Sequence, residues 1–188
     1  MPGSIPISRA GDSVLLVVDI QERLAAAMPE ESRQTVFRNA GILAQAAQLL
    51  DIPGILTEQY PRGLGPTDSA VAPHLGGKIR RLEKTVFSCC GAGGFAEALQ
   101  SVQRRQVVIT GMEAHVCVLQ TALELAAQGF EVFVVEDAIC SRSPVNQRNA
   151  IERIRQAGSI VTNTESVLFE WLRHAKHEHF KAISKLVR

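Results

Sequence analysis

The chain has 188 residues, of which 46% are hydrophobic, and its 20 Lys and Arg residues against 19 Asp and Glu give a formal net charge of +1. This length and apolar content predict a substantial hydrophobic core and exclude a disordered chain. The balanced charge, without a long block of one sign, argues against nucleic acid or a membrane as a partner and favours a small molecule.

Short β-branched runs alternate along the chain with longer stretches of helical periodicity. Nearly continuous apolar strands indicate burial on both faces, as in a parallel sheet between two layers of helices. The alternation predicts a three-layer α/β fold with a doubly wound, mostly parallel, six-stranded sheet. In chain order, the expected strands are 13–20, 54–59, 78–85, 106–112, 131–138 and 159–163, and the expected helices are 31–50, 94–103, 116–128 and 144–156.

We expect a single domain over residues 1–188, with its core in residues 12–170 and a solvated helical tail in 171–188. The tail contains three histidines but no acidic or cysteine partner beside them, so it is assigned no chemistry: His174, His177 and His179. The irregular stretch 60–77 is rich in Gly and Pro, and long loops of this kind often carry function.

The composition also bears on cellular location. The stretch MPGSIPISRAGD lacks a basic segment followed by an apolar one, and no apolar run approaches the roughly 18 residues of a membrane span. The four cysteines form no C-x-x-C pair, which is typical of reduced thiols. We therefore expect a soluble, cytoplasmic protein with no membrane partner.

Reactive side chains stand at the ends of three predicted strands. Asp19 follows four apolar residues, Lys84 ends the run RRLEK, and Cys117 lies at the start of a predicted helix. In an open parallel sheet, ligands bind outside the carboxyl ends of the strands. Each residue also has a plain interpretation: a turn aspartate, a solvated lysine, or an inert core cysteine. A position in the first turn of a helix would lower the pKa of the Cys117 thiol.

The order Asp, Lys, Cys at these strand ends resembles the isochorismatase-like cysteine hydrolase superfamily, in particular a short branch that carries G-x-E-x-H-x-C. The resemblance covers about residues 12–170. The segments that carry it are LLVVDIQ (15–21), EKTVFSC (83–89), VVITGMEAHVCVLQTALELAAQGFEV (107–132) and VVEDAICSRS (134–143).

The resemblance implies a Rossmann-like sheet with strand order 3-2-1-4-5-6 and a catalytic triad of Asp19, Lys84 and Cys117. In this scheme Asp19 accepts the thiol proton, Lys84 holds the aspartate and favours the thiolate, and Cys117 attacks a carbonyl carbon. The backbone N–H groups of Glu113 and Cys117 form the oxyanion hole, and the Met112–Glu113 peptide bond is cis. The resemblance also implies a homo-oligomer.

Nicotinamidases of this superfamily hold a metal with an Asp-x-His pair after the second strand. Here Thr57-Glu58-Gln59-Tyr60 stands at that place, and His74 is the one histidine of the following loop. We therefore expect neither a metal nor another cofactor. Glu113 replaces a common alanine of the family, and either lines the pocket or faces a loop.

Several further residues are candidates for a substrate pocket, and each has a structural alternative. Gln21 either orients the carboxylate or substrate or lies at the surface, and Phe87 is either a pocket wall or core. The segment Glu58, Gln59 and Tyr60 either contacts substrate or anchors its loop. His115 suggests a Cys-His dyad, but residues two apart on a helix face different directions.

Arg142 is expected to clasp a loop or a subunit interface, and Cys89, Cys90 and Cys140 are expected to be structural. The leading functional hypothesis is a metal-independent cysteine hydrolase that cleaves a small amide or related C–N bond through a thioester. The alternatives are a vinyl-ether or ester hydrolase of the same superfamily, and a catalytically silent scaffold or interaction protein.

Overall fold

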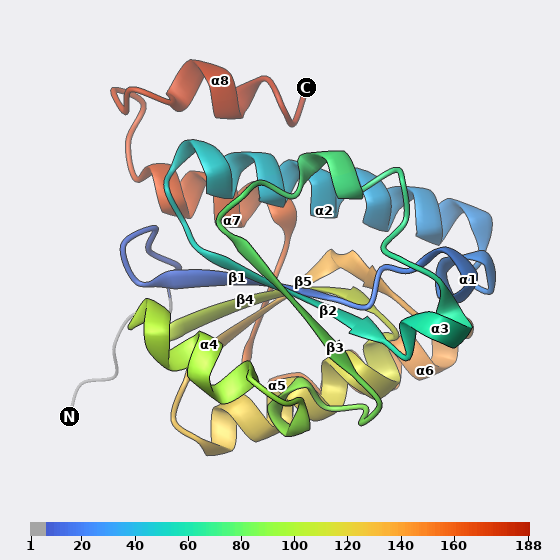
Figure 1. The fold of residues 1–188 in the computed structure, drawn as a ribbon. Helices are drawn as coiled ribbons and strands as arrows, with labels where there is room; N and C mark the ends of the chain where they lie inside the picture. The colour runs from blue at the N-terminus through green and yellow to red at the C-terminus, as the bar shows by residue number, and fades with distance from the viewer. Residues whose placement is uncertain (1–6) are drawn as a thin grey trace.

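A computed structural model describes residues 7–188 and contains a six-stranded sheet (Figure 1). All paired strands are parallel and lie in the order β3-β2-β1-β4-β5-β6, which confirms the predicted architecture. The winding reverses between β1 and β4, where such sheets bind ligands. The strands are β1 (Ser13–Val18), β2 (Gly54–Gln59), β3 (Ile79–Lys84), β4 (Gln106–Met112), β5 (Glu131–Cys140) and β6 (Ile160–Thr162).

Helices cover both faces of the sheet, α2 and α7 on one side and α4, α5 and α6 on the other (Figure 1). Each face has its own apolar cluster, because the central strands are buried on both sides. Within residues 7–188, no helix combines the length and apolar character needed to cross a bilayer. The helices are α1 (Glu22–Ala26), α2 (Glu30–Leu49), α3 (Pro61–Leu64), α4 (Phe95–Val102), α5 (Leu119–Ala127), α6 (Pro144–Gln156), α7 (Thr164–Leu172) and α8 (Phe180–Ser184), with short helical turns η1 (Ala72–His74), η2 (Cys89–Gly91) and η3 (Ala114–Val118).

Two element boundaries near the carboxyl edge differ from the prediction. β1 ends at Val18 rather than at residue 20, because Asp19 leaves the extended conformation with φ of 51°. The helix predicted over 116–128 starts instead as the π-helical turn η3 and becomes α-helical only at Leu119. Single π-helical turns are frequent at functional sites.

Gly111 brings β4 unusually close to β1. Its φ is +128°, and an added Cβ would stand 2.0 Å from the Val18 carbonyl oxygen. Only glycine fits this conformation and this spacing. The register between β4 and β5 shifts at the same place, between Ile109 and Gly111. The close approach sets the end of β4 against the residue that precedes Asp19.

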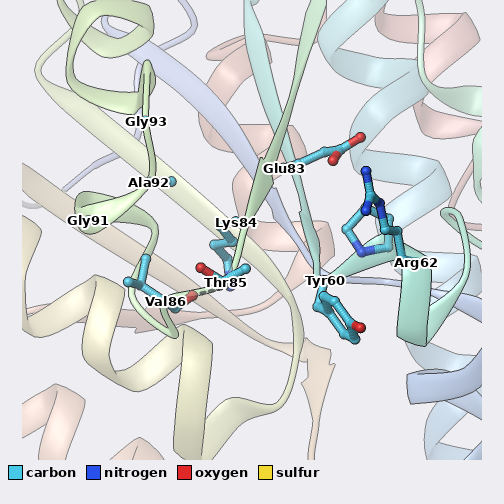
Figure 2. A pocket seen from close by; sticks show the side chains of 10 residues that line it. Tyr60, Arg62, Glu83, Lys84, Thr85, Val86, Gly91, Ala92 and Gly93 are labelled. Atoms are coloured by element: carbon cyan, nitrogen blue, oxygen red, sulfur yellow. Dashed lines mark hydrogen bonds between the residues drawn. The ribbon is translucent and has the colours of Figure 1, made fainter.

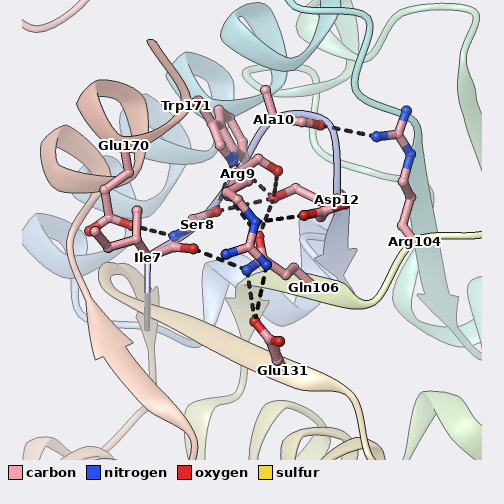
Figure 3. Close-up of polar contacts among 11 residues, drawn as sticks. Ile7, Ser8, Arg9, Ala10, Asp12, Arg104, Gln106, Glu131, Glu170 and Trp171 are labelled. Atoms are coloured by element: carbon pink, nitrogen blue, oxygen red, sulfur yellow. Dashed lines mark hydrogen bonds and ion pairs between the residues drawn. The ribbon is translucent and has the colours of Figure 1, made fainter. Parts of the chain in front are cut away.

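Buried polar contacts at the amino ends of the strands tie residues 8–12 and α7 to the sheet (Figure 3). The indole N–H of Trp171 donates to Ser8 Oγ at 2.8 Å and to Ser13 Oγ at 3.1 Å. Trp171 is therefore a core residue, and the expectation of a solvated tail from position 171 is wrong there. Helix α7 ends at Leu172, and a separate short helix, α8, follows; its Ile183 is also buried.

Candidate functional site

The carboxyl ends of three strands bring Asp19, Lys84 and Cys117 together. Asp19 follows β1, Lys84 ends β3, and Cys117 lies in η3 directly after β4. All three residues are buried, with 0%, 4% and 4% of their surface exposed. Parallel strands present their carboxyl ends at one edge, which explains why residues so distant in the chain meet here.

The Asp19 carboxylate is held by a donor on each oxygen. Thr57 Oγ1 donates to Oδ1 at 2.7 Å, and Lys84 Nζ donates to Oδ2 at 2.6 Å. The side chains of Asp19 and Lys84 are both fully buried, so their charges depend on each other for compensation. The left-handed backbone of Asp19 is a conformation that aspartate adopts more readily than most residues.

The Lys84 ammonium uses its three N–H groups within the protein. Nζ donates to Asp19 at 2.6 Å, to Gln59 Oε1 at 2.7 Å and to the Phe87 carbonyl at 2.9 Å. Burial opposes the positive charge, but Asp19 and Cys117 outweigh it, and the pKa of Lys84 lies above its ordinary value. Lys84 is therefore an ammonium at neutral pH.

Cys117 is a thiol at neutral pH, which corrects the prediction of a lowered pKa. Burial raises the pKa of Cys117 to about 12, and the negative charge of the Asp19 carboxylate adds to the rise. The Lys84 ammonium lowers the pKa but does not compensate for these effects. A helix start and a nearby lysine both lower a thiol pKa, and the prediction rests on these two effects. Burial beside a carboxylate raises the pKa and outweighs them.

The same effect predicts that the protein loses stability in alkali. Burial raises the pKa of Cys89 to about 11 and that of Cys140 to about 12. Unfolding returns these thiols to a pKa of about 8.5, so the unfolded state releases protons first. The contribution of these thiols to the free energy of unfolding should be fully present below about pH 8.5 and should fall as the pH rises through about 9 to 11. Urea unfolding across this range measures it, and Cys140→Val should flatten the decline, whereas equal slopes in both proteins would contradict it.

Glu113 forms the junction between β4 and η3. The Met112–Glu113 peptide bond is cis, as predicted. Among residues 7–188, no group accepts a hydrogen bond from the Glu113 N–H. The Glu113 carboxylate accepts from the Arg142 backbone N–H at 2.9 Å and from Arg142 Nε at 3.1 Å. Of the two interpretations of Glu113, the structure supports contact with a loop, and Arg142 clasps that loop as expected.

Two of the predicted pocket residues anchor the 60–77 loop instead. Gln21 Nε2 donates to the Gln59 and Gly65 carbonyl oxygens, at 3.0 and 2.7 Å. Glu58 Oε1 accepts from the backbone N–H and the hydroxyl of Thr67, at 2.7 and 2.6 Å. Glu58 is buried, so the structure favours its anchoring alternative. Gln21 is fully buried, which contradicts its surface alternative, and its contact with the loop was not predicted.

His115 and Phe87 also have defined places. His115 Nδ1 lies 2.9 Å from Ser141 Oγ, which turns the ring toward the loop after β5, so the ring is committed to Ser141 rather than to a dyad with Cys117. Phe87 is 54% exposed and is not a core residue. Its carbonyl oxygen, rather than its ring, contacts the Lys84 ammonium.

A pocket of about 440 Å³ opens beside Lys84 (Figure 2). Tyr60 is among the residues that line it and is 54% exposed. Asp19 and Cys117 lie outside this lining, so Lys84 is the residue that the pocket and the triad share. The lining consists of Tyr60, Pro61, Arg62, Glu83, Lys84, Thr85, Val86, Gly91, Ala92 and Gly93.

The described part of the chain contains no cluster of metal-ligating side chains. Within residues 7–188, no three His, Cys, Asp or Glu side chains form a group that could hold a metal ion. At the strand end where metal-dependent relatives carry ligands, the Gln59 amide instead bridges Lys84 Nζ and the Thr85 carbonyl.

Comparison with known proteins places this geometry in a family. Residues 13–166 match the isochorismatase domain. The chain belongs to the isochorismatase family. Isochorismatase domain-containing protein 2 of Danio rerio is 40% identical over 187 residues, which cover 93% of this chain and 86% of that protein.

Two solved structures extend the family match to the fold. The MAR1 ribonuclease from Caenorhabditis elegans has a TM-score of 0.90 at 35% identity, and the match covers 96% of this chain and 92% of that one. YcaC from Pseudomonas aeruginosa, described with hexane-2,5-diol and covalent acrylamide, has a TM-score of 0.90 at 27% identity, with 98% and 93% covered. Family membership points to a hydrolase.

Sequence reasoning missed several residues of the site. In the sequence, the segment of Thr57 indicates only a lack of metal ligands, yet the Thr57 hydroxyl contacts Asp19 in the structure. Its place two residues before Gln59 on a buried strand was the available signal, since alternate residues share one face. Other residues that line the pocket show no recognisable pattern in the sequence, namely the small residues Gly91 to Gly93 and the charged residues Arg62 and Glu83.

Proposed function

We propose that the protein is a cysteine hydrolase of small amides or related C–N bonds, with Asp19, Lys84 and Cys117 as its catalytic residues. The observation that carries the proposal is the buried Asp19–Lys84 ion pair next to the Cys117 thiol. A buried ion pair is costly to maintain, and its position at the carboxyl edge of the sheet suits catalysis.

The raised pKa of Cys117 shapes the first chemical step. The thiol proton passes to Asp19 as Cys117 Sγ bonds to the carbonyl carbon, so no free thiolate accumulates beforehand. The developing oxyanion accepts hydrogen bonds from the backbone N–H groups of Glu113 and Cys117. The unpartnered N–H of Glu113 supports this assignment.

The remaining steps regenerate the enzyme. The C–N bond breaks, Asp19 returns its proton to the leaving amine, and an acyl thioester remains on Cys117. Asp19 then accepts a proton from water as the water oxygen attacks the thioester carbonyl. The C–S bond breaks, the carboxylic acid leaves, and the proton on Asp19 returns to Cys117. Lys84 stays an ammonium throughout and holds the Asp19 charge.

The Pseudomonas aeruginosa relative supports the presence of a reactive nucleophile. It is described with covalent acrylamide, an electrophile that nucleophilic side chains alkylate at its alkene carbon. A panel of primary amides from acetamide to benzamide, with matched esters and vinyl ethers, tests the proposal by ammonia or acid release. We expect amide turnover by the wild type and none by Cys117→Ala. Equal ammonia release by both proteins would remove the nucleophile, and turnover of esters or vinyl ethers alone would favour those alternative hydrolases.

A second candidate comes from the name of the Caenorhabditis elegans relative, a ribonuclease. The net charge of +1 gives this chain little electrostatic attraction for RNA. A single-stranded RNA oligonucleotide therefore belongs in the panel as a substrate. Cleavage of RNA by the wild type, retained in Cys117→Ala, would favour that function over the amidase. If neither substrate class is turned over, the silent-scaffold alternative gains support.

We propose that the pocket beside Lys84 holds the body of the substrate. Gly93 lines it, and an added Cβ there would meet no atom within 4 Å, so a larger side chain fits without disturbing the fold. Gly93→Leu should lower kcat/KM by about tenfold or more, since each lost 1.4 kcal/mol of binding is a factor of ten. Gly77→Leu, equally unobstructed but outside the pocket, is the matched control. Unchanged kinetics in Gly93→Leu would place the substrate elsewhere.

Assembly and location remain predictions. Tyr60, Val86 and Phe87 expose apolar side chains around the site, which supports a homo-oligomer that covers this edge. Light scattering on the purified protein measures the stoichiometry. The expected cytoplasmic location is tested by fractionation.

A further inference from the structure

Two side chains on one face of β2 contact the two charged members of the triad. Thr57 donates to Asp19, and Gln59 accepts from Lys84. Residues 57 and 59 share a face because side chains alternate along a strand. Glu58, between them, contacts Thr67 instead. The end of β2 therefore carries two polar groups, one that contacts the anion directly after β1 and one that contacts the cation at the end of β3.

We infer that Thr57 and Gln59 are positioning residues that fix the Asp19 carboxylate and the Lys84 ammonium relative to Cys117. This inference rests on the proposed function, in which Asp19 accepts the proton of the Cys117 thiol and Lys84 holds the Asp19 charge. Neither residue needs to touch the substrate. The expectation that Gln59 contacts substrate is thereby replaced by a role through Lys84.

Thr57 limits how the carboxylate can turn. Its hydroxyl occupies Oδ1 at 2.7 Å while Lys84 occupies Oδ2 at 2.6 Å, so rotation of the carboxylate would break both bonds. Thr57 is fully buried, and its hydroxyl also lies 3.6 Å from Cys89 Sγ. The hydrogen bond takes up part of the carboxylate charge that would otherwise act on the thiol.

Gln59 completes the shell of the ammonium. Its Oε1 accepts from Lys84 at 2.7 Å, and its Nε2 donates to the Thr85 carbonyl at 2.8 Å, which fixes the orientation of the amide. The other acceptors are Asp19 and the Val86 and Phe87 carbonyl oxygens, so the ammonium has no N–H left for a substrate. Lys84 thus acts on Cys117 by its charge and position alone.

Alkylation of Cys117 by iodoacetamide tests the inference without a known substrate. The pseudo-first-order rate at pH 8.5 is followed by site-resolved mass spectrometry. Thr57→Val should alkylate more slowly by about tenfold, equivalent to about one pKa unit, because the carboxylate then presents more of its charge to the thiol. Thr57→Ser keeps the hydroxyl and should restore the wild-type rate. Gln59→Met should also be slower, because Lys84 is less firmly held near the sulfur.

Double variants separate positioning from general damage. In an Asp19→Asn background, Thr57→Val should no longer change the rate, and in a Lys84→Met background, Gln59→Met should no longer change it. Thr110→Val is the matched control, since it removes a buried threonine hydroxyl that contacts the Ala138 carbonyl rather than the triad. Its alkylation rate should equal that of the wild type.

Two results would overturn the inference. One is a Thr57→Val rate equal to or above that of the wild type, and the other is an effect that persists undiminished in the Asp19→Asn background. Failure of the proposed function looks different, since it shows as an absence of Cys117-dependent amide turnover with the alkylation couplings intact. Where turnover is found, Thr57→Val should lower kcat by about 10²-fold with KM unchanged, the usual effect of a small misplacement.

Discussion

Asp19→Asn should slow hydrolysis and speed alkylation at the same sulfur. Loss of the general base should lower kcat/KM for an amide by about 10²–10⁴-fold. Cys117 should nevertheless react faster with iodoacetamide at pH 8.5, because the Asp19 carboxylate raises the pKa of the thiol in the wild type. Asparagine is the suitable replacement, since it tolerates the left-handed φ of 51°.

The opposite signs make this experiment specific. A generally damaged site would lose hydrolysis without gaining reactivity toward iodoacetamide. If alkylation slowed together with hydrolysis, Asp19 would favour the thiolate, and the proton transfer proposed for the first step would be wrong. The alkylation of Cys90 serves as the internal reference. Cys90 is part-buried, and the Asp19 carboxylate does not contribute to the shift of its pKa.

Lys84→Met should strongly destabilise the fold. It leaves the Asp19 carboxylate buried without a counter-charge, which costs about 3–5 kcal/mol in comparable cases. For a chain of this length, each kcal/mol of destabilisation lowers Tm by about 2–4 °C. Removal of the ammonium should also raise the pKa of Cys117, because Lys84 lowers it in the wild type. Urea unfolding and the iodoacetamide rate measure the two effects.

A matched control lies six residues earlier. Lys78 pairs with Asp51 at 2.5 Å, but both side chains are exposed, at 60% and 77%. Lys78→Met should therefore leave stability nearly unchanged, as is usual for surface ion pairs. The double variant Asp19→Asn with Lys84→Met should be less destabilised than Lys84→Met alone, since no unpaired charge remains. Equal losses in Lys78→Met and Lys84→Met would contradict the buried pair.

The alternation of apolar strands and periodic helices was enough to predict the sheet. All six strands match the prediction to within two residues at each end, because buried β-branched runs and their Gly and Pro boundaries are local signals. The sequence also placed Asp19, Lys84 and Cys117 at strand ends, and the parallel topology then requires that they share an edge.

The tertiary structure decided the properties that depend on several segments at once. The raised pKa of Cys117 follows from burial next to a carboxylate that lies 98 positions earlier in the chain, and no local pattern reports this. The same holds for Gln21 and Glu58. Their hydrogen bonds to the 60–77 loop are visible only in the structure, and they show that both side chains anchor this loop.

The sequence by itself determined the order of strands and helices, the edge at which chemistry occurs, and the three residue types that meet there. These depend on periodicity and on the direction of parallel strands, both of which are local properties. Only the tertiary structure decided which hydrogen bonds each buried polar group makes and which protonation state the sulfur holds. Such properties depend on distances of a few ångströms between side chains from different strands, and sequence spacing does not encode those distances.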